Sequence, residues 1–275
     1  MLRCVSTCLA LLFALPVAAE IELDGPLTQG GLMTGRIAPG YALELDGEPV
    51  KVAPDGRFVI GFGRDAELSH TLTVLDTNGG TVEQRSLRLE DRSFDIERID
   101  GLPDETVTLP PEYYERRKRE TGMVRKARAP VTDSMHWAEG FRWPARGRIS
   151  GVYGSQRILN GEPRWPHYGV DVAAPEGTPV LAPASGVVQL AENDFLLEGG
   201  IVIIDHGFGV SSTLMHLASV DVEAGRRIAA GERIGTIGAT GRATGAHVDW
   251  RINWRDRRLD PQLLVDEPSH DEARR

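Results

Sequence analysis

Short hydrophobic runs that alternate with turn-forming residues dominate the first third of the chain. The runs 41–45, 58–60 and 71–75 are each bordered by an Asp-Gly or Asn-Gly turn signal. Runs of this length, bounded by glycine with aspartate or asparagine, are typical of antiparallel strands. Their regular spacing predicts a small β-sandwich domain over residues 20–102.

Between residues 103 and 140 the pattern changes from alternating to highly charged. Two prolines precede the charged run 112–120, and prolines at that place favour a short helix that starts just after them. Gly122 and Pro130 bound its continuation. The basic residues of 116–128 are typical of a solvated helix face, with contact to an acidic polymer as the alternative. We expect a partly helical linker over 103–140.

From residue 141 onward, glycine and proline interrupt β-like runs at short intervals, with scarcely a helix signal. The clearest runs are 148–154, 179–183, 186–190, 200–204 and 227–238. Dense short strands of this kind predict an antiparallel β domain over 141–265 and place the chain in the all-β class. The last segment, 266–275, has no apolar pattern, and we expect a disordered tail.

The N-terminus has the pattern of a secretory signal peptide. Arg3 supplies a positive start, 8–16 form a short apolar stretch, and small residues occupy 17–19. The apolar stretch is too short to span a bilayer. We therefore expect a signal peptide over 1–19, export to the periplasm or elsewhere in the cell envelope, and no transmembrane anchor once the signal is removed.

Charge and cysteine content narrow the possible partners. The chain has 40 Asp and Glu against 31 Lys and Arg, a formal net charge of −9, whereas general nucleic-acid binding needs a basic surface. Both cysteines, Cys4 and Cys8, lie in the expected signal peptide, so the mature chain would hold no disulfide. Its core must then depend on packing or on a metal.

Two segments of the C-terminal half alternate so that polar side chains share one face of a strand. In 167–172 that face carries His167 and Asp171. In 247–254 it carries His247, Asp249, Arg251 and Asn253. Two such strands could converge on one zinc site, because zinc accepts imidazole and carboxylate, and three protein ligands with an open position make a catalytic site. The same alternation also describes a half-solvated sheet whose polar residues simply face water.

Motifs in a fixed order resemble those of the lysostaphin-type, or LytM-like, zinc metallopeptidases. Residues 166–180 resemble the first motif, a histidine and an aspartate separated by three residues. Residues 206–217 resemble the second motif, 238–250 the third, and the Leu-Asp-Pro of 259–261 the closing element. The resemblance covers about 141–265. It implies a LytM-like β domain that binds zinc and cuts peptide bonds in peptidoglycan.

The resemblance also implies roles for individual residues. His167 and Asp171 would bind zinc. His216 and His247 would flank the attacking water and the scissile carbonyl, where one imidazole takes a proton and the other stabilises the oxyanion or protonates the leaving amine. His206 lies in a motif but on a turn, and we expect a structural role for it.

The chain departs from the family pattern at one position. The third motif of the family reads histidine, any residue, histidine, and the second of these is Asp249 here. A carboxylate binds zinc at a distance similar to that of an imidazole, so we expect Asp249 to complete the metal site. Two anionic ligands would leave the metal a weaker Lewis acid, with slower hydrolysis or a preference for a harder cation.

These features support hypotheses of three classes. The first is an exported zinc endopeptidase that cuts stem-peptide crosslinks of peptidoglycan, with other envelope proteins as partners of the N-terminal sandwich. The second is a degenerate LytM-like domain that has lost its metal and activates separate cell-wall amidases, an alternative that Asp249 keeps open. The third is carbohydrate binding, which is weaker because two of the tryptophans lie on an apolar strand face. The tryptophans are Trp137, Trp143, Trp165, Trp250 and Trp254.

Overall fold

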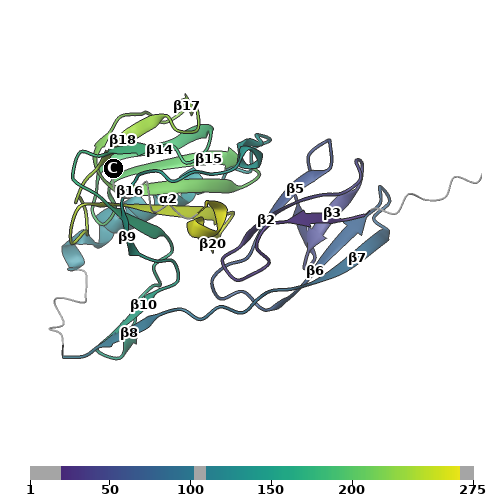
Figure 1. The fold of residues 1–275 in the computed structure, drawn as a ribbon, viewed down its shortest axis with the longest axis horizontal. Coiled ribbons are helices and arrows are strands. Elements are labelled where there is room, and N and C mark those ends of the chain that lie inside the picture. Colours follow the sequence, from purple (N-terminus) through teal and green to yellow (C-terminus); the bar gives the residue numbers. More distant parts are fainter. Residues whose placement is uncertain (1–19, 102–109, 267–275) are drawn as a thin grey trace, which may run out of the picture.

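The computed structural model describes residues 20–101 and 110–266, in which strands far outnumber helices (Figure 1). The predicted all-β class is confirmed. The expected signal peptide and all but the first residue of the expected tail lie outside the described residues. In the described ranges, no helix is long and apolar enough to cross a membrane.

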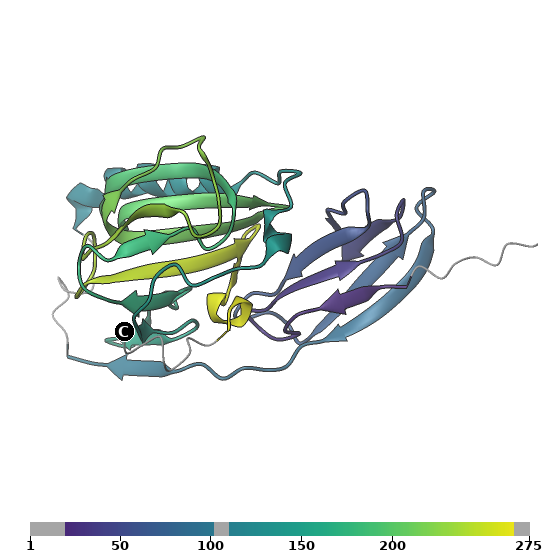
Figure 2. The same ribbon diagram turned by 45° about the horizontal axis from the view of Figure 1, so that its top comes forward.

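The N-terminal region forms two antiparallel sheets, one of three strands in the order β1-β2-β5 and one of four in the order β4-β3-β6-β7. Side chains that alternate inward, among them Leu43, Phe58 and Leu72, are buried in a common core. The predicted small sandwich therefore forms (Figure 2). The strands are β1 (Glu22–Asp24), β2 (Leu32–Arg36), β3 (Ala42–Leu45), β4 (Glu48–Val50), β5 (Arg57–Gly61), β6 (Ser69–Leu75) and β7 (Thr81–Arg88).

Strand β8 (Ile96–Ile99) leaves the sandwich, although its residues were expected to belong to it. It pairs in parallel with β10 (Gln156–Leu159), which pairs in turn with β11 (Glu162–Pro163). The resulting small sheet extends away from the larger C-terminal sheet in Figure 1. Local alternation shows that a strand forms but does not show its partner, because these partners lie far apart in the sequence.

The C-terminal region is built on a ten-stranded sheet with the main order β17-β14-β15-β16-β19-β12-β9. Strand β18 pairs with β13 and β16, and β20 pairs with β19. Its strands are β9 (Arg148–Gly151), β12 (Val170–Ala173), β13 (Pro179–Leu181), β14 (Gly186–Phe195), β15 (Gly199–Gly207), β16 (Val210–Val220), β17 (Arg227–Ile228), β18 (Arg233–Ile237), β19 (His247–Trp254) and β20 (Arg257–Leu259). The 3-10 turns η2 (His136–Glu139) and η3 (Pro261–Leu264) flank it.

Strand β19 pairs with β16 along most of one edge. Its other edge, called the first edge below, has a different partner along each half. The first edge pairs with β12 at its beginning, where Val170 lies opposite Trp250, and with β20 at its end, where Leu259 lies opposite Ile252. The strands β12 and β20 therefore meet end to end beside the middle of β19, and we call this place the junction between β12 and β20.

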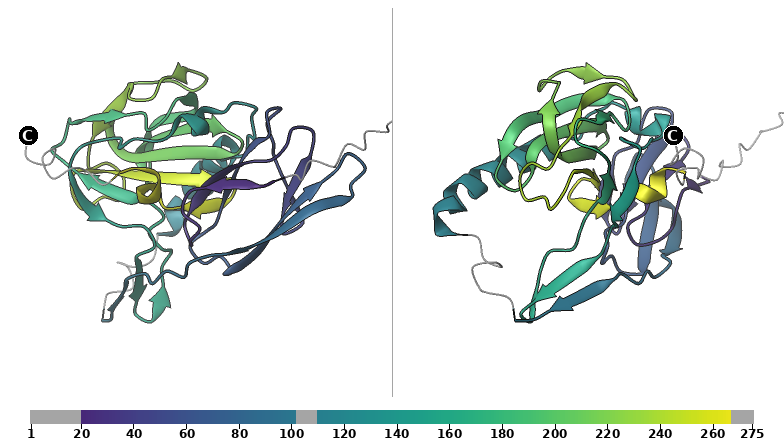
Figure 3. Two further views of the ribbon diagram at one scale, coloured as in Figure 1. Left: turned by 45° about the vertical axis from the view of Figure 1, so that its right-hand side comes forward. Right: turned by 60° about the vertical axis from the view of Figure 1, so that its left-hand side comes forward.

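The helix α2 (Tyr114–Arg128) packs on one face of the large sheet and is longer than the predicted helix (Figure 3). It follows the 3-10 turn η1 (Pro111–Tyr113) and runs through Gly122. Glycine inside a helix costs about 1 kcal/mol relative to alanine. The burial of Ala127, with Met123 and Val124 packed beside it on the sheet, offsets that cost.

The opposite face of the large sheet contains the main hydrophobic core. Trp250 and Trp254 are buried there, as their place on the apolar face of the strand predicts. Trp137 of η2 is also buried, and its ring centroid lies 5.6 Å from that of Phe208 in a tilted arrangement. Carbohydrate binding through these three side chains is therefore sterically blocked, whereas Trp165 is 87 % exposed.

Polar contacts join the N-terminal sandwich to the large sheet. Arg92 Nη2 lies 2.8 Å from Asp260 Oδ2, and this carboxylate is buried. Arg64 Nε donates to Gly154 O at 2.8 Å, and Arg257 Nη1 donates to Gly61 O at 3.0 Å. These bonds run in both directions across the junction, so they fix the sandwich against β20 and the residues before β10.

Glu120 anchors α2, and its removal tests whether the helix is an integral part of the fold. Its buried carboxylate accepts from Arg116 and from the backbone N–H of Leu196. We expect Glu120→Ala to lower the free energy of unfolding by about 1–3 kcal/mol, because a buried donor loses its acceptor. Glu115→Ala, an exposed change on the same helix, should cost about 0.5 kcal/mol or less. Equal effects of the two changes in urea denaturation would contradict the anchoring role.

Candidate metal centre

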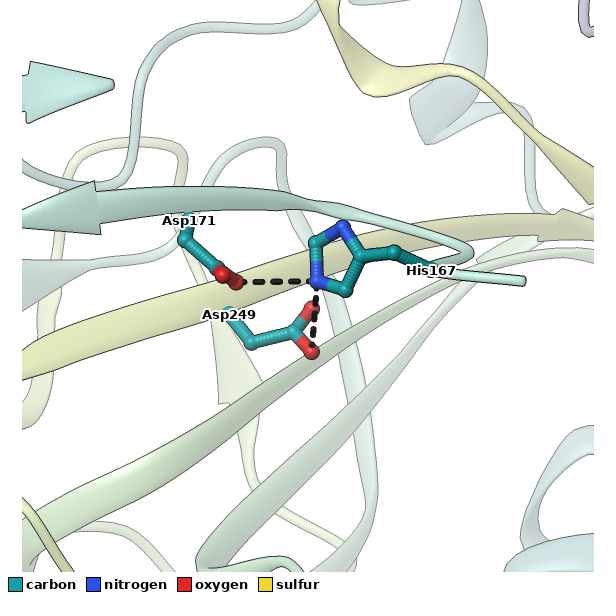
Figure 4. Close-up of side chains that lie close together, drawn as sticks. All are labelled: His167, Asp171 and Asp249. Carbon is teal, nitrogen blue, oxygen red and sulfur yellow. Dashed lines mark ion pairs between the residues drawn. The ribbon is translucent and has the colours of Figure 1, made fainter. Parts of the chain in front are cut away.

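The three predicted metal ligands come together on one side of the large sheet. His167 lies just before β12, Asp171 within β12 and Asp249 within β19. One ligand atom from each lies within 4.8 Å of the others (Figure 4). His167 Nε2 is 3.0 Å from Asp171 Oδ1 and 3.3 Å from Asp249 Oδ2. Neighbouring ligand atoms around tetrahedral zinc are about 3.3 Å apart, so this spacing fits a metal.

The strand register creates this proximity. Asp171 and Asp249 are directly opposite each other in the antiparallel β12–β19 pair. His167 lies in the extended segment before the strand, not within it as expected, yet its ring reaches the same point. Glycines supply the necessary space: a Cβ at Gly151 would lie 2.2 Å from Asp171 Oδ2, and one at Gly169 2.3 Å from Asp249 Oδ1.

The two opposed carboxylates require a positive charge between them, since like charges directly across a strand pair destabilise it. Asp171 Oδ1 is buried, and while His167 is neutral with a lone pair on Nε2, Oδ1 accepts no hydrogen bond from the residues that the structure describes. A buried acceptor without a donor is costly unless a cation occupies the site. His167, Asp171 and Asp249 therefore have both the chemistry and the unsatisfied group that a divalent cation needs.

Backbone carbonyls fix the tautomers of the three histidines at the site. Each imidazole places Nδ1 against a carbonyl oxygen, which can only accept, so Nδ1 carries a proton and neutral imidazole keeps its lone pair on Nε2. The pairs are His167 with Val152 O at 3.2 Å, His216 with Thr240 O at 2.9 Å and His247 with Gly245 O at 2.8 Å. Such outer hydrogen bonds orient histidines that bind metals or transfer protons.

His216 and His247 adjoin the three candidate ligands. Their ring centroids are 4.7 Å apart, and His247 Nε2 lies 3.8 Å from Asp171 Oδ1. His216 has a backbone φ of 65°, which is rare for a residue with a side chain. Strained backbone of this kind occurs where the surrounding structure imposes a side-chain position. The site thus contains all five residues that the sequence singled out.

Arg251 is a member of the site to which the sequence pattern gave no role. Its Nη2 lies 2.6 Å from Asp249 Oδ2, and its Nε lies 3.0 and 3.1 Å from the two carboxylate oxygens. Two carboxylates and one guanidinium leave a net charge of −1 around neutral imidazoles. Asp249 was expected to add a full negative charge to the site, but Arg251 offsets much of that charge. The signal was its position two residues after Asp249 on the same strand face.

Burial and charge pairing shift the pKa values of the site in different directions. Burial alone would lower the pKa of His167, but hydrogen bonds and charges from Asp171 and Asp249 raise it to about 10. Burial would raise the pKa of Asp249, yet Arg251 and His167 hold it well below its usual range. Burial lowers the pKa of His216, so this imidazole is neutral at pH 7. Without a metal, a proton on His167 Nε2 balances the carboxylates.

His206 lies apart from this cluster. Its Nδ1 is 2.7 Å from Ser185 O and its Nε2 is 2.7 Å from Ser212 Oγ, and the ring is fully buried. Burial lowers its pKa to about 4. Since both nitrogens have partners, the geometry suits the structural role expected for it.

The raised pKa of His167 predicts how the stability of chelator-treated protein depends on pH. A proton that binds the folded state more tightly stabilises it fully below pH 6.5, and this stabilisation is lost as the pH rises through about 10. We expect the free energy of unfolding, from urea titrations, to fall between these limits in the wild type and to change less in His167→Gln. His136→Gln, a change at a half-buried histidine of η2 outside the site, should behave as the wild type does. Identical pH profiles for wild type and His167→Gln would contradict the shift.

Comparisons with known proteins place the C-terminal region in a family. Residues 165–261 match the model of peptidase family M23. The chain is 36 % identical over 119 residues to the peptidoglycan DD-endopeptidase ShyA of Vibrio cholerae, a match that covers 42 % of this chain and 27 % of that protein. It is 30 % identical over 131 residues to the cell division protein DipM of Caulobacter vibrioides, covering 46 % of this chain and 21 % of that protein.

A solved structure extends the similarity to both regions of the chain. The crystal structure of a putative peptidase M23 from Pseudomonas aeruginosa aligns with a TM-score of 0.67 and 26 % identity, and covers 86 % of this chain and 94 % of that one. The curated relatives are longer, and the matched part spans about a quarter of their length. The motif order and the family match agree over the same residues: residues 165–261 carry the sequence pattern of a peptidase family M23 domain.

Proposed function

We propose that the protein is a metal-dependent endopeptidase that hydrolyses an amide bond in the stem peptides of peptidoglycan. The observation that carries this proposal is the convergence of His167, Asp171 and Asp249 within 4.8 Å, where a neutral His167 leaves Asp171 Oδ1 without a hydrogen bond. The similarity to a peptidoglycan DD-endopeptidase supports the substrate class. Action on this polymer would require export, which is consistent with the pattern of residues 1–19.

Zinc is the cation we propose for this site, where it would polarise the substrate carbonyl and make a water molecule more acidic. The remaining steps fall to residues of the chain. His216 is neutral at pH 7, and its Nε2 lone pair is available because Nδ1 binds Thr240 O. It can accept the proton of the attacking water and return it to the leaving amine. His247, whose ring lies beside that of His216, would donate to the carbonyl oxygen in its imidazolium form, in which Nε2 also carries a proton.

The degenerate, regulatory hypothesis retains support from one observation. Arg251 already holds both oxygens of Asp249, and a protonated His167 would satisfy the remaining charge without a metal. In that case the domain would act as a binding module, for example as an activator of cell-wall amidases. The two functions differ in metal content and in catalysis, so two experiments separate them.

Elemental analysis of protein purified without chelators tests the metal. We expect about one zinc per chain, as for sites with three protein ligands. Asp249→Ala should reduce the zinc content to near zero, because one ligand is removed. Asp221→Ala, which removes an exposed carboxylate paired with Arg233, should leave it unchanged. A wild type free of metal and unaffected by chelators would favour the regulatory function.

Digestion of purified sacculi tests catalysis. We expect release of cut crosslinks by the wild type and a rate about 100- to 10,000-fold lower for His216→Ala, the usual effect of losing a general base. The matched control is His136→Ala, at a half-buried histidine of η2 that lies outside the site, and it should retain the wild-type rate. Undiminished cleavage by His216→Ala would refute the assigned role of this imidazole.

A further inference from the structure

A cavity of about 380 Å³ lies where the N-terminal sandwich meets the junction between β12 and β20. One wall is the segment 62–66, which follows β5, and the other is formed by Tyr168 with Arg257 and Arg258. This volume lies in the range of small-ligand pockets. The charges of Arg251 and Asp249 act on Arg258, so the cavity adjoins the metal centre.

The cavity is strongly cationic. Three arginines line it, Arg64, Arg257 and Arg258, against a single carboxylate, Asp65. Arg64 is paired with Asp65 and Gly154 O, and Arg257 donates to Gly61 O. Among the residues that the structure describes, no carboxylate or carbonyl oxygen is bonded to the guanidinium of Arg258. The Arg258 guanidinium instead lies over the ring of Tyr168, 5.4 Å from the ring centroid.

The position of Arg258 relative to the metal centre follows from the strand register. Arg258 is the Cα partner of Asn253 in the β19–β20 pair. Asn253 is four residues from Asp249 on the same strand, a separation of about 13 Å at 3.3 Å per residue. A peptide with its cleaved bond at the metal centre could therefore reach Arg258 with a group a few residues away.

We propose that this cavity binds a free carboxylate of the peptide substrate and that Arg258 recognises it. The guanidinium offers a planar, two-pronged donor that matches a carboxylate, and Tyr168 supports it through the ring contact. Unpaired and half-buried, it gains more from such a partner than a solvated arginine would. Burial and the nearby Arg251 lower the pKa of Arg258, which is consistent with a missing counter-charge.

This inference also gives the N-terminal sandwich a role in substrate selection. The segment 62–66 closes the cavity opposite Tyr168, and hydrogen bonds through Arg64 and Arg257 fix it in place. The carboxylate subsite therefore needs both regions of the chain. The inference rests on the proposed function, because its occupant is the peptide that the metal centre would cut.

Binding of matched peptides tests the proposal in the full-length His216→Ala protein, in which cleavage should be slow. The probes are a fluorescent peptidoglycan stem peptide with free carboxylates and the same peptide with carboxamides, compared by fluorescence anisotropy. We expect the free acid to bind about tenfold more tightly, the effect of one charge-assisted hydrogen bond. A second change, Arg258→Gln, should bring this ratio to about one, whereas Arg258→Lys should retain part of it.

Arg255→Gln is the matched control, because Arg255 lies in the turn beside Arg258 but donates to Pro49 O outside the cavity. It should keep the tenfold ratio. Equal binding of acid and amide without the Arg258 change would overturn the proposal, as would a tenfold ratio that persists in Arg258→Gln. The comparison of acid and amide binding without the Arg258 change remains valid even if Arg258→Gln fails to fold. Because the assay needs neither cleavage nor zinc analysis, a failed peptidase function remains distinguishable from a failed subsite.

Discussion

The site depends on the opposition of two carboxylates, Asp171 and Asp249, on neighbouring antiparallel strands. Buried like charges at that spacing are unstable unless cationic groups lie between and beside them. The surrounding chain meets this requirement from three directions. Glycines leave room for the carboxylates, His167 places Nε2 between them, and Arg251 binds the far side of Asp249. While His167 is neutral, Asp171 Oδ1 accepts no hydrogen bond, and it is the atom that a metal would bind.

Arg251 changes the meaning of the aspartate that replaces the usual histidine. A carboxylate held by a guanidinium carries little net charge, so the pair resembles a neutral ligand more than a second anion. The electrostatic reason to expect a weakened Lewis acid is then smaller than the substitution alone suggests. The same contact explains how the site could persist without a metal, because the ion pairs of Arg251 and a protonated His167 form a closed network.

Much of this arrangement follows from alternation in the sequence. The period-two pattern of 247–254 placed Asp249 with Arg251 and buried Trp250 on the opposite face, as the structure has them. Features that depend on distant partners were not predictable in this way. The pairing of β8 with β10 and the wall that 62–66 forms beside Arg258 join segments far apart in the chain. The length of α2 was missed because packing against the sheet outweighs the local cost of Gly122.

The most direct measurement of the central claim is anomalous diffraction at the zinc edge from crystals of the metal-loaded protein. The account predicts one peak about 2.0–2.2 Å from His167 Nε2 and from one oxygen each of Asp171 and Asp249. Arg251 should remain bound to Asp249 in the same map. A site without a peak, with His167 Nε2 hydrogen-bonded directly to the two carboxylates, would contradict it.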